Sequence, residues 1–169
     1  MKKIILNIAV SLDGYIAGPN REIDWLFTDQ DYGFTEFYNS VDKIIMGRKS
    51  YDKCLEFDEW YYKGKDCYVI TSSKSYTDND KVKFVNTDLE SFVNKVKNES
   101  VKDIWLLGGG MLISSFLDLD LIDEMILSIH PVLLGKGIPL VQNLRTPKNF
   151  ITKSVKTFET GLVQIAYSK

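Results

Sequence analysis

The sequence Asp103-Ile-Trp-Leu-Leu-Gly-Gly-Gly-Met-Leu-Ile-Ser-Ser-Phe-Leu117 contains an apolar run, three consecutive glycines and a second apolar segment. The first run, from 104 to 107, has no polar alternation and stops at a breaker, which is typical of a strand buried on both faces. The segment after the glycines is compatible with a helix. We therefore expect a buried strand that turns directly into a helix.

The three glycines leave this turn without any Cβ atom, so backbone N–H groups can approach a ligand closely. The helix that follows adds unpaired N-terminal donors and the positive end of its dipole. Together these features predict an anion cradle, and the pyrophosphate of a dinucleotide is the obvious anion. The alternative is a tight turn in which glycine only permits close packing, and the sequence leaves both interpretations open.

Two common phosphate-binding motifs are not matched. In the dinucleotide fingerprint G-x-G-x-x-G, the last glycine would fall on Ile113. Arg48-Lys49-Ser50 lacks the glycines of a P-loop. A nucleotide would therefore bind on another α/β scaffold.

Composition limits the class of protein. The 169 residues fit one domain, 1–169, and 44% hydrophobic with 26% charged residues is ordinary for a soluble globular protein. A net charge of −2 argues against general nucleic-acid binding. Cys54 and Cys67 have no C-x-x-C spacing and are read as reduced cytoplasmic thiols. No stretch has the length of a membrane span. The expected protein partner is a second copy of the chain in a homodimer.

Strands and helices are expected to alternate over most of the chain. Apolar stripes predict helices at 34–41 and 89–96, and a short helix at 48–54 follows Gly47. Thr87 and Glu90 fit a capping box with Thr87 as N-cap. Strands are expected at 3–10, 44–46, 67–71, 82–85, 104–107 and 124–134, the last bent at His130-Pro131, with a closing hairpin at 150–158 and 162–167 and a loop at 15–26.

This order predicts an α/β fold. The central sheet would be mostly parallel, with helices on both faces and an antiparallel C-terminal hairpin. In such sheets ligands bind beyond the carboxyl ends of the strands. The polar or glycine-rich segments that follow predicted strands are Asp13-Gly14, Gly47 to Ser50, Ser72 to Lys74 and Gly108 to Gly110. Their shared position at strand exits predicts one binding site.

Basic and hydroxyl side chains at these exits suit a phosphorylated ligand. Arg48 and Lys49 open a helix beside Ser50, where a phosphate would receive both charge and backbone donors. The segment Ser72 to Lys74 offers hydroxyls and another cation. With the triple glycine these groups could hold an adenine dinucleotide, including a 2′-phosphate.

Candidates for acid–base chemistry are few. His130 is the only histidine, so multi-histidine metal sites are excluded and a histidine-dependent triad would have to use this one residue. Because it lies next to Pro131 in a strand, we expect it to be a packed or turn residue. Asp31 follows an aromatic loop that contains Trp25 and Phe27. It is either a buried carboxylate that acts on a planar ligand or a helix-start carboxylate stabilised by the helix dipole.

Four segments together resemble the dihydrofolate reductase-like superfamily, and more closely its RibD C-terminal branch, the reductase domain of bacterial riboflavin biosynthesis. They cover nearly the whole chain in the expected order. The matching segments are Ser11-Leu-Asp-Gly-Tyr-Ile-Ala17, Met46-Gly-Arg-Lys-Ser-Tyr51, Gly108-Gly-Gly110 with Leu121-Ile-Asp-Glu124, and Pro131-Val-Leu-Leu-Gly-Lys-Gly-Ile-Pro-Leu140.

The resemblance implies NADPH-dependent hydride transfer to a carbon–nitrogen double bond of a small pterin- or pyrimidine-type substrate, such as dihydrofolate or the ribosylaminopyrimidine of the riboflavin pathway. By family position, the cofactor-binding residues are Ala9, Ile16, Gly47, Arg48, Lys49, Ser50, Ser72, Ser73, Lys74, Gly108, Gly109, Gly110 and Met111. The substrate-binding residues would be Asp13, Trp25 and Ser128, and Asp31 the catalytic carboxylate.

Two other classes of function stay open at this stage. One is a nucleotide- or pterin-binding protein that keeps the fold without turnover, and the other is a folded module that serves only as an oligomeric scaffold. The glycine turn and the basic pair favour a nucleotide-binding function over the scaffold. Asp31 separates the enzyme from the binder, because a binder needs no proton source there.

Overall fold

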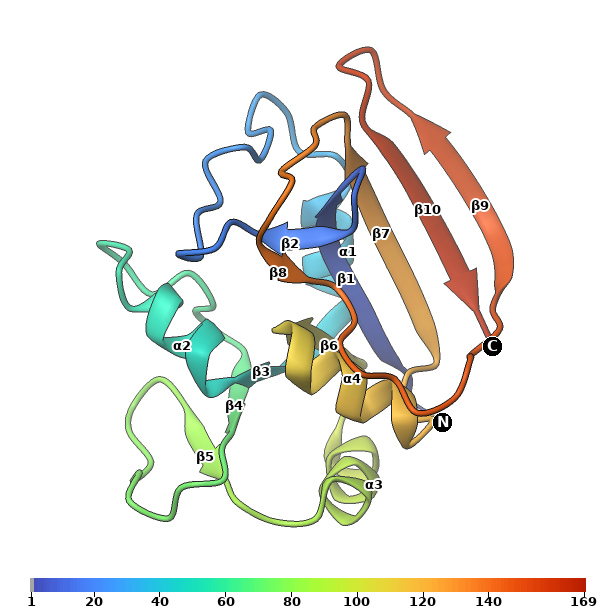
Figure 1. The fold of residues 1–169 in the computed structure, drawn as a ribbon. Coiled ribbons are helices and arrows are strands. Elements are labelled where there is room, and N and C mark those ends of the chain that lie inside the picture. The colour runs from blue at the N-terminus through green and yellow to red at the C-terminus, as the bar shows by residue number, and fades with distance from the viewer. Residues whose placement is uncertain (1) are drawn as a thin grey trace.

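The computed structural model describes residues 2–169, in which eight strands form a central sheet (Figure 1). In spatial order they are β5 (Lys83–Val85), β4 (Asp66–Ile70), β3 (Val41–Gly47), β6 (Asp103–Gly108), β1 (Ile4–Ser11), β7 (Glu124–His130), β10 (Val163–Ser168) and β9 (Ile151–Thr157). All pairs from β5 to β7 are parallel, whereas β10 pairs antiparallel with both β7 and β9. The predicted α/β sheet with an antiparallel C-terminal hairpin is confirmed.

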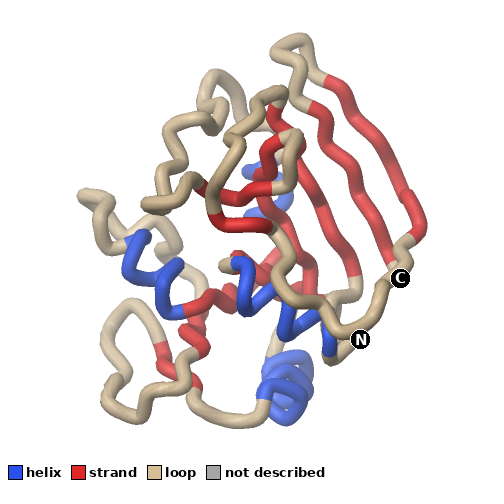
Figure 2. Tube along the Cα trace, in the orientation of Figure 1, coloured by secondary structure: helices blue, strands red, loops and turns tan. Residues whose placement is uncertain are grey.

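Helices cover both faces of the parallel part of the sheet (Figure 2). Side chains of α1 (Phe34–Ser40) and α2 (Arg48–Cys54) belong to one apolar cluster, and those of α3 (Leu89–Glu99) and α4 (Gly110–Asp118) belong to the other. The central strands contribute alternate residues to each cluster, so runs such as Ile4 to Leu6, Ile44 to Met46 and Ile104 to Leu106 are apolar without alternation. The strand–glycine–helix unit predicted around Gly108 to Gly110 is therefore β6 followed by α4.

The segment 15–26, which we expected to be entirely loop, contributes one strand to a second, two-stranded sheet. β2 (Tyr15–Ala17) pairs antiparallel with β8 (Ile138–Pro139). The pairing depends on Gly137, because a Cβ atom at this position would lie 2.2 Å from the carbonyl oxygen of Ala17. Strands this short and this distant in sequence leave no periodic pattern that could predict them.

The start of α3 differs from the expected capping box. Asp88, and not Thr87, is the N-cap, and its side chain accepts a hydrogen bond of 2.9 Å from the backbone N–H of Ser91. Aspartate and threonine both cap helices well, so the sequence motif alone could not decide which of the two adjacent residues is the N-cap. The strand expected to continue to 134 also ends earlier, at His130, because the following Pro131 has no N–H to donate.

The sheet extends beyond its helices at the C-terminal hairpin. Every residue of β9 is exposed and no residue of β10 is fully buried. The register between these strands shifts at Ala166 and Tyr167, where Lys153 has no direct partner. Among residues 2–169, no helix combines the length and the apolar character that crossing a membrane would require.

One close contact fixes α4 against the segment that follows β8. A Cβ atom on Gly110 would lie 2.4 Å from the carbonyl oxygen of Pro139 and 2.8 Å from Nε2 of Gln142. The first of these atoms belongs to the backbone and cannot move without shifting the chain. Glycine at 110 is therefore required by packing, whatever it contributes to a ligand.

We predict that Gly110→Ala lowers the free energy of unfolding in urea by about 1–3 kcal/mol, the usual cost of overpacking a filled site. Alanine gains roughly 0.5–1 kcal/mol of helix propensity, which only partly offsets this loss. Gly47→Ala is the matched control, because the nearest atom to its added Cβ would be 3.7 Å away. Equal stability of Gly110→Ala and wild type would contradict the packing argument.

Candidate functional site

The carboxyl ends of β1, β3, β4 and β6 meet at one edge of the sheet, where they border a cavity of about 780 Å³. This volume is within the range of pockets that hold small molecules and cofactors. Ten of the predicted residues line it. They are Ala9, Ile16, Gly47, Arg48, Lys49, Ser50, Ser72, Gly109, Gly110 and Met111.

The glycine turn brings the start of α4 to the cavity. Gly109 is the N-cap and makes no side-chain cap, and the first helical hydrogen bond runs from Ile113 N–H to the carbonyl of Gly109 at 3.0 Å. The N–H groups of the first turn therefore remain for a ligand. Gly108, also predicted, is buried below the cavity wall, where an added Cβ would lie 3.3 Å from both Ile8 and Ile113.

Helix α2 supplies positive charge beside this turn. Asp52 forms an ion pair with Nη1 of Arg48, which orients the guanidinium and leaves its other N–H groups for a ligand. Lys49 is exposed and has no ion pair among the residues that the structure describes. Ser50 packs on the glycine turn, since its Oγ would be 3.2 Å from a Cβ on Gly109.

The exit of β4 contributes less than we expected. Thr71 and Ser72 line the cavity, but Ser73 and Lys74 do not. The Ser73 hydroxyl lies 2.5 Å from that of Ser75, and Lys74 is exposed. A local turn closed by hydroxyl groups thus directs Ser73 away from the cavity.

Apolar and aromatic residues also line the cavity. Its wall includes Trp105 and Leu107 from β6 together with Tyr62, and the Trp105 indole N–H donates to the Asn7 carbonyl at 3.0 Å. Burial raises the pKa of Tyr62 above its usual range, and burial likewise raises the pKa of the neighbouring Cys54 thiol. Both groups are therefore neutral at physiological pH, as suits a planar, uncharged ring.

Asp31 does not have the environment expected of a buried catalytic carboxylate. It is exposed, is absent from the cavity wall, and accepts hydrogen bonds from Thr35 Oγ1 at 2.6 Å and Thr35 N–H at 3.0 Å. The Thr35 hydroxyl and the nearby backbone N–H groups hold the pKa of Asp31 below its usual range. Of the two interpretations of Asp31, the structure has the helix-start carboxylate, because Thr35 satisfies it at the start of α1.

The three predicted substrate residues also lie off the cavity wall. Asp13 accepts hydrogen bonds from Ser11 Oγ at 2.6 Å and from the backbone N–H groups of Leu134 and Gly135 at 3.1 and 2.7 Å. It therefore ties the end of β1 to the loop before β8. Ser128 accepts a hydrogen bond from the Gln164 amide at 3.1 Å.

Trp25, the third of them, packs edge-on against His130 with ring centroids 5.2 Å apart. Phe27 contacts the same imidazole at 5.0 Å. Burial lowers the pKa of His130, so the ring is neutral. His130 is thus the packed residue that we expected.

Several residues of the cavity wall were not predicted from the sequence. Asn7 interrupts the first apolar strand, and Trp105 lies inside the central one, so both carried a weak signal. Arg21 and Lys53 carried none, because an isolated cation in a loop or at a helix end is ordinary. Together with Arg48 and Lys49 they make four cations on the wall, and no aspartate or glutamate of residues 2–169 lines it.

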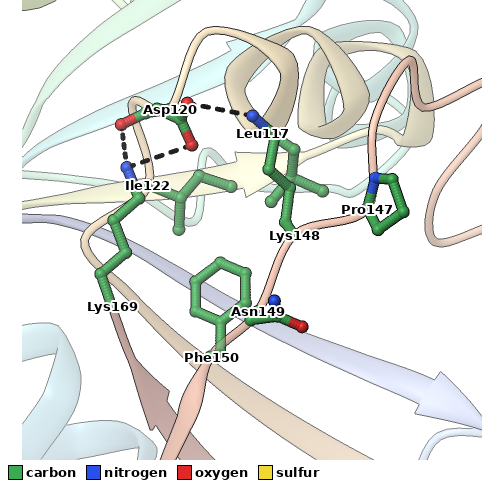
Figure 3. A pocket seen from close by; sticks show the side chains of 8 residues that line it. All are labelled: Leu117, Asp120, Ile122, Pro147, Lys148, Asn149, Phe150 and Lys169. Atoms are coloured by element: carbon green, nitrogen blue, oxygen red, sulfur yellow. Dashed lines mark hydrogen bonds and ion pairs between the residues drawn. The ribbon is translucent and has the colours of Figure 1, made fainter.

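A smaller cavity of about 290 Å³ lies between the C-terminal end of α4 and the N-terminal end of β7 (Figure 3). Lys148 contacts the Asp120 carboxylate at 3.0 Å, and Lys169 contacts it at 3.7 Å. Figure 3 shows both lysines directed at Asp120 above the apolar side chains of Ile122 and Phe150. Both ammonium groups are thus already engaged by the single carboxylate of Asp120 within the cavity wall.

Comparison with known proteins finds relatives that match this chain over nearly its whole length. YyaP of Bacillus subtilis (strain 168), named an uncharacterized protein, is 41% identical over 178 residues, with 98% of this chain and 94% of that protein covered. A solved structure from Shewanella sp. PV-4, named provisionally for riboflavin biosynthesis, is 32% identical with a TM-score of 0.88 over 98% of both chains.

A more distant structure shows the same fold within a longer protein. The diaminohydroxyphosphoribosylaminopyrimidine deaminase/5-amino-6-(5-phosphoribosylamino)uracil reductase of Thermotoga maritima matches with a TM-score of 0.76 at 16% identity. The match covers 99% of this chain and 56% of that one. The model of the RibD C-terminal domain matches residues 2–164, and the chain therefore belongs to the RibD C-terminal domain family.

Proposed function

We propose that this chain is an NADPH-dependent reductase that transfers a hydride to a carbon–nitrogen double bond of a small pyrimidine- or pterin-type substrate. The observation that carries the proposal is that the wall of one cavity combines two unlike sets of residues. One set combines cations with uncapped backbone donors, and the other is aromatic and uncharged. The deaminase/reductase of Thermotoga maritima, which shares the fold, supports the same class of reaction.

The cationic set fits a dinucleotide phosphate. The glycine turn allows close approach, the first turn of α4 offers N–H donors, and Arg48 presents a fork of donors suited to a phosphate. When bound, NADPH would supply the hydride. In this arrangement Gly109 and Gly110 would bind the pyrophosphate, and Arg48 with Lys49 the 2′-phosphate.

The middle of the cavity would hold the reacting rings. Ala9 and Ile16 line the cavity, and small or branched apolar side chains exclude water without adding charge. Trp105 and Tyr62 would stack on or border the substrate ring. The role of the protein is thus orientation of two planar groups.

The proton required by the reduced nitrogen would come from solvent. No aspartate, glutamate or histidine within residues 2–169 lines the cavity. The pKa of Asp31 is lowered, so its carboxyl group is ionised at neutral pH and is a poor proton donor even if a ligand reached it. A substrate whose ring must be protonated by a buried acid during reduction therefore fits this cavity less well than a neutral pyrimidine does.

The decisive experiment is a turnover assay with two candidate substrates. Dihydrofolate and the pyrimidine ribosylamine of the riboflavin pathway are each supplied with NADPH, and oxidation is followed by the loss of its near-ultraviolet absorbance. We expect oxidation with the ribosylamine. Binding of NADPH without oxidation by either substrate would contradict the reductase and indicate a nucleotide-binding protein instead.

Arg48→Ala should weaken the binding of NADPH much more than the binding of NADH. Loss of a charge-assisted hydrogen bond costs about 1.5–3 kcal/mol, which corresponds to roughly a tenfold to a hundredfold rise in Kd for NADPH. Quenching of tryptophan fluorescence on titration measures both values, since Trp105 lines the cavity. Arg145→Ala is the control, because its side chain is 83% exposed. Equal losses for both cofactors would show that Arg48 does not contact the 2′-phosphate.

Asp31→Asn should leave kcat unchanged and lower thermal stability at neutral pH. The pKa of Asp31 is depressed in the folded protein, so its contribution to stability exists above the unfolded pKa and disappears as pH falls through the folded value. The difference in Tm from wild type should therefore vanish in acid. Asp58→Asn, at another exposed carboxylate, is the control. A large fall in kcat with unchanged Tm would return Asp31 to the catalytic role.

A further inference from the structure

Arg21 occupies an unusual backbone position on the wall of the large cavity. It lies in the loop between β2 and α1, and its φ is 66°, in the left-handed region. A residue with a Cβ atom adopts this conformation at a cost in free energy, and such costs persist where the surrounding structure enforces them. Glycine would adopt this conformation without the cost, so an arginine here suggests that its side chain has a use.

The surrounding loop is closed by its own hydrogen bonds. Arg21 N–H donates to the Gly18 carbonyl at 3.0 Å, and Gly18 N–H donates to the Glu22 carbonyl at 2.9 Å. The Glu22 carboxylate accepts from both the backbone N–H and the side-chain amide of Asn20, each at 2.8 Å. The nearest acidic residue is therefore directed toward Asn20 and does not pair with Arg21.

The charge balance of the cavity wall leaves Arg21 without a counterion. Of its four cations, Arg48 pairs with Asp52, and Lys53 pairs with Glu56 at 2.5 Å, whereas Lys49 and Arg21 have no ion pair within residues 2–169. Across residues 2–169 the Arg21 guanidinium has neither an ion pair nor a side-chain hydrogen bond, and no carboxylate shares the wall with it. A guanidinium without a protein counterion is available to an oxyanion, which supplies the opposing charge through charge-assisted hydrogen bonds.

We propose that Arg21 binds a phosphate group of a ligand in this cavity, as an anion contact separate from Arg48 and Lys49 on α2. A guanidinium matches phosphate oxygens with two parallel N–H donors, which an ammonium group cannot do. Arg21 reaches the cavity from the loop that also carries Ile23 and Leu26, whereas the other cations of the wall all lie on α2. The assignment deepens the proposed function, since the phosphate belongs either to the dinucleotide or to a phosphorylated substrate.

Calorimetric titration with inorganic pyrophosphate tests the site without any turnover. Arg21→Gly removes the guanidinium and also relieves the left-handed backbone, so the free energy of unfolding should stay equal or rise. We expect its Kd for pyrophosphate to rise about tenfold or more. Arg21→Lys should lie between this variant and wild type, and Arg145→Ala should match wild type. Wild type that fails to bind millimolar pyrophosphate, or Arg21→Gly that binds as wild type does, would overturn the proposal.

A second set of titrations identifies the source of the phosphate. An equal loss of affinity for NADPH and NADH in Arg21→Gly assigns the pyrophosphate, and a loss for NADPH alone assigns the 2′-phosphate. A raised KM for the phosphorylated ribosylamine, with both cofactor affinities unchanged, assigns the substrate. No change in any of these quantities would overturn the proposal. Should no substrate be reduced while Arg21 still governs pyrophosphate binding, the reductase would be wrong and the anion site would stand.

Discussion

Parallel pairing of β3, β4, β6 and β1 is the constraint on which the cavity depends. Strands that run in one direction bring their carboxyl ends to one edge, and each of these strands hands the chain to a loop or helix there. Segments far apart in the sequence thereby become neighbours without any contact that would have to be encoded locally. The glycine turn can then approach α2 because no Cβ atom stands between it and Ser50.

The elements with a strong local signal were predictable. The bounds of α2 were predicted correctly from a glycine followed by a short run, and β6 with α4 followed from an apolar run and three glycines. Burial of Phe92, Val93 and Val96 in α3 followed from their helical spacing. These features depend on propensity and on burial of one face, which a single sequence carries directly.

The failures have a common physical cause, which is that polar side chains have several satisfactory partners. Asp31 could cap a helix or enter a pocket, and only the folded backbone shows that Thr35 satisfies it. Asp13 could bind a ligand, but the N–H groups of Leu134 and Gly135 reach it first. Arg21 is the opposite case, since its importance lies in lacking a partner, and no sequence motif records such an absence.

The exposed strand β9 sets how this end of the molecule can meet other chains. Its outer edge offers unpaired backbone donors and acceptors, which would template a further strand from any unfolded neighbour. Lys153 and Lys156 place charge along that edge, and the shift of register at Ala166 interrupts the regular spacing that such a ladder would need. Charge and an irregular ladder together disfavour the addition of a further strand along β9, which is the route to open-ended fibrils.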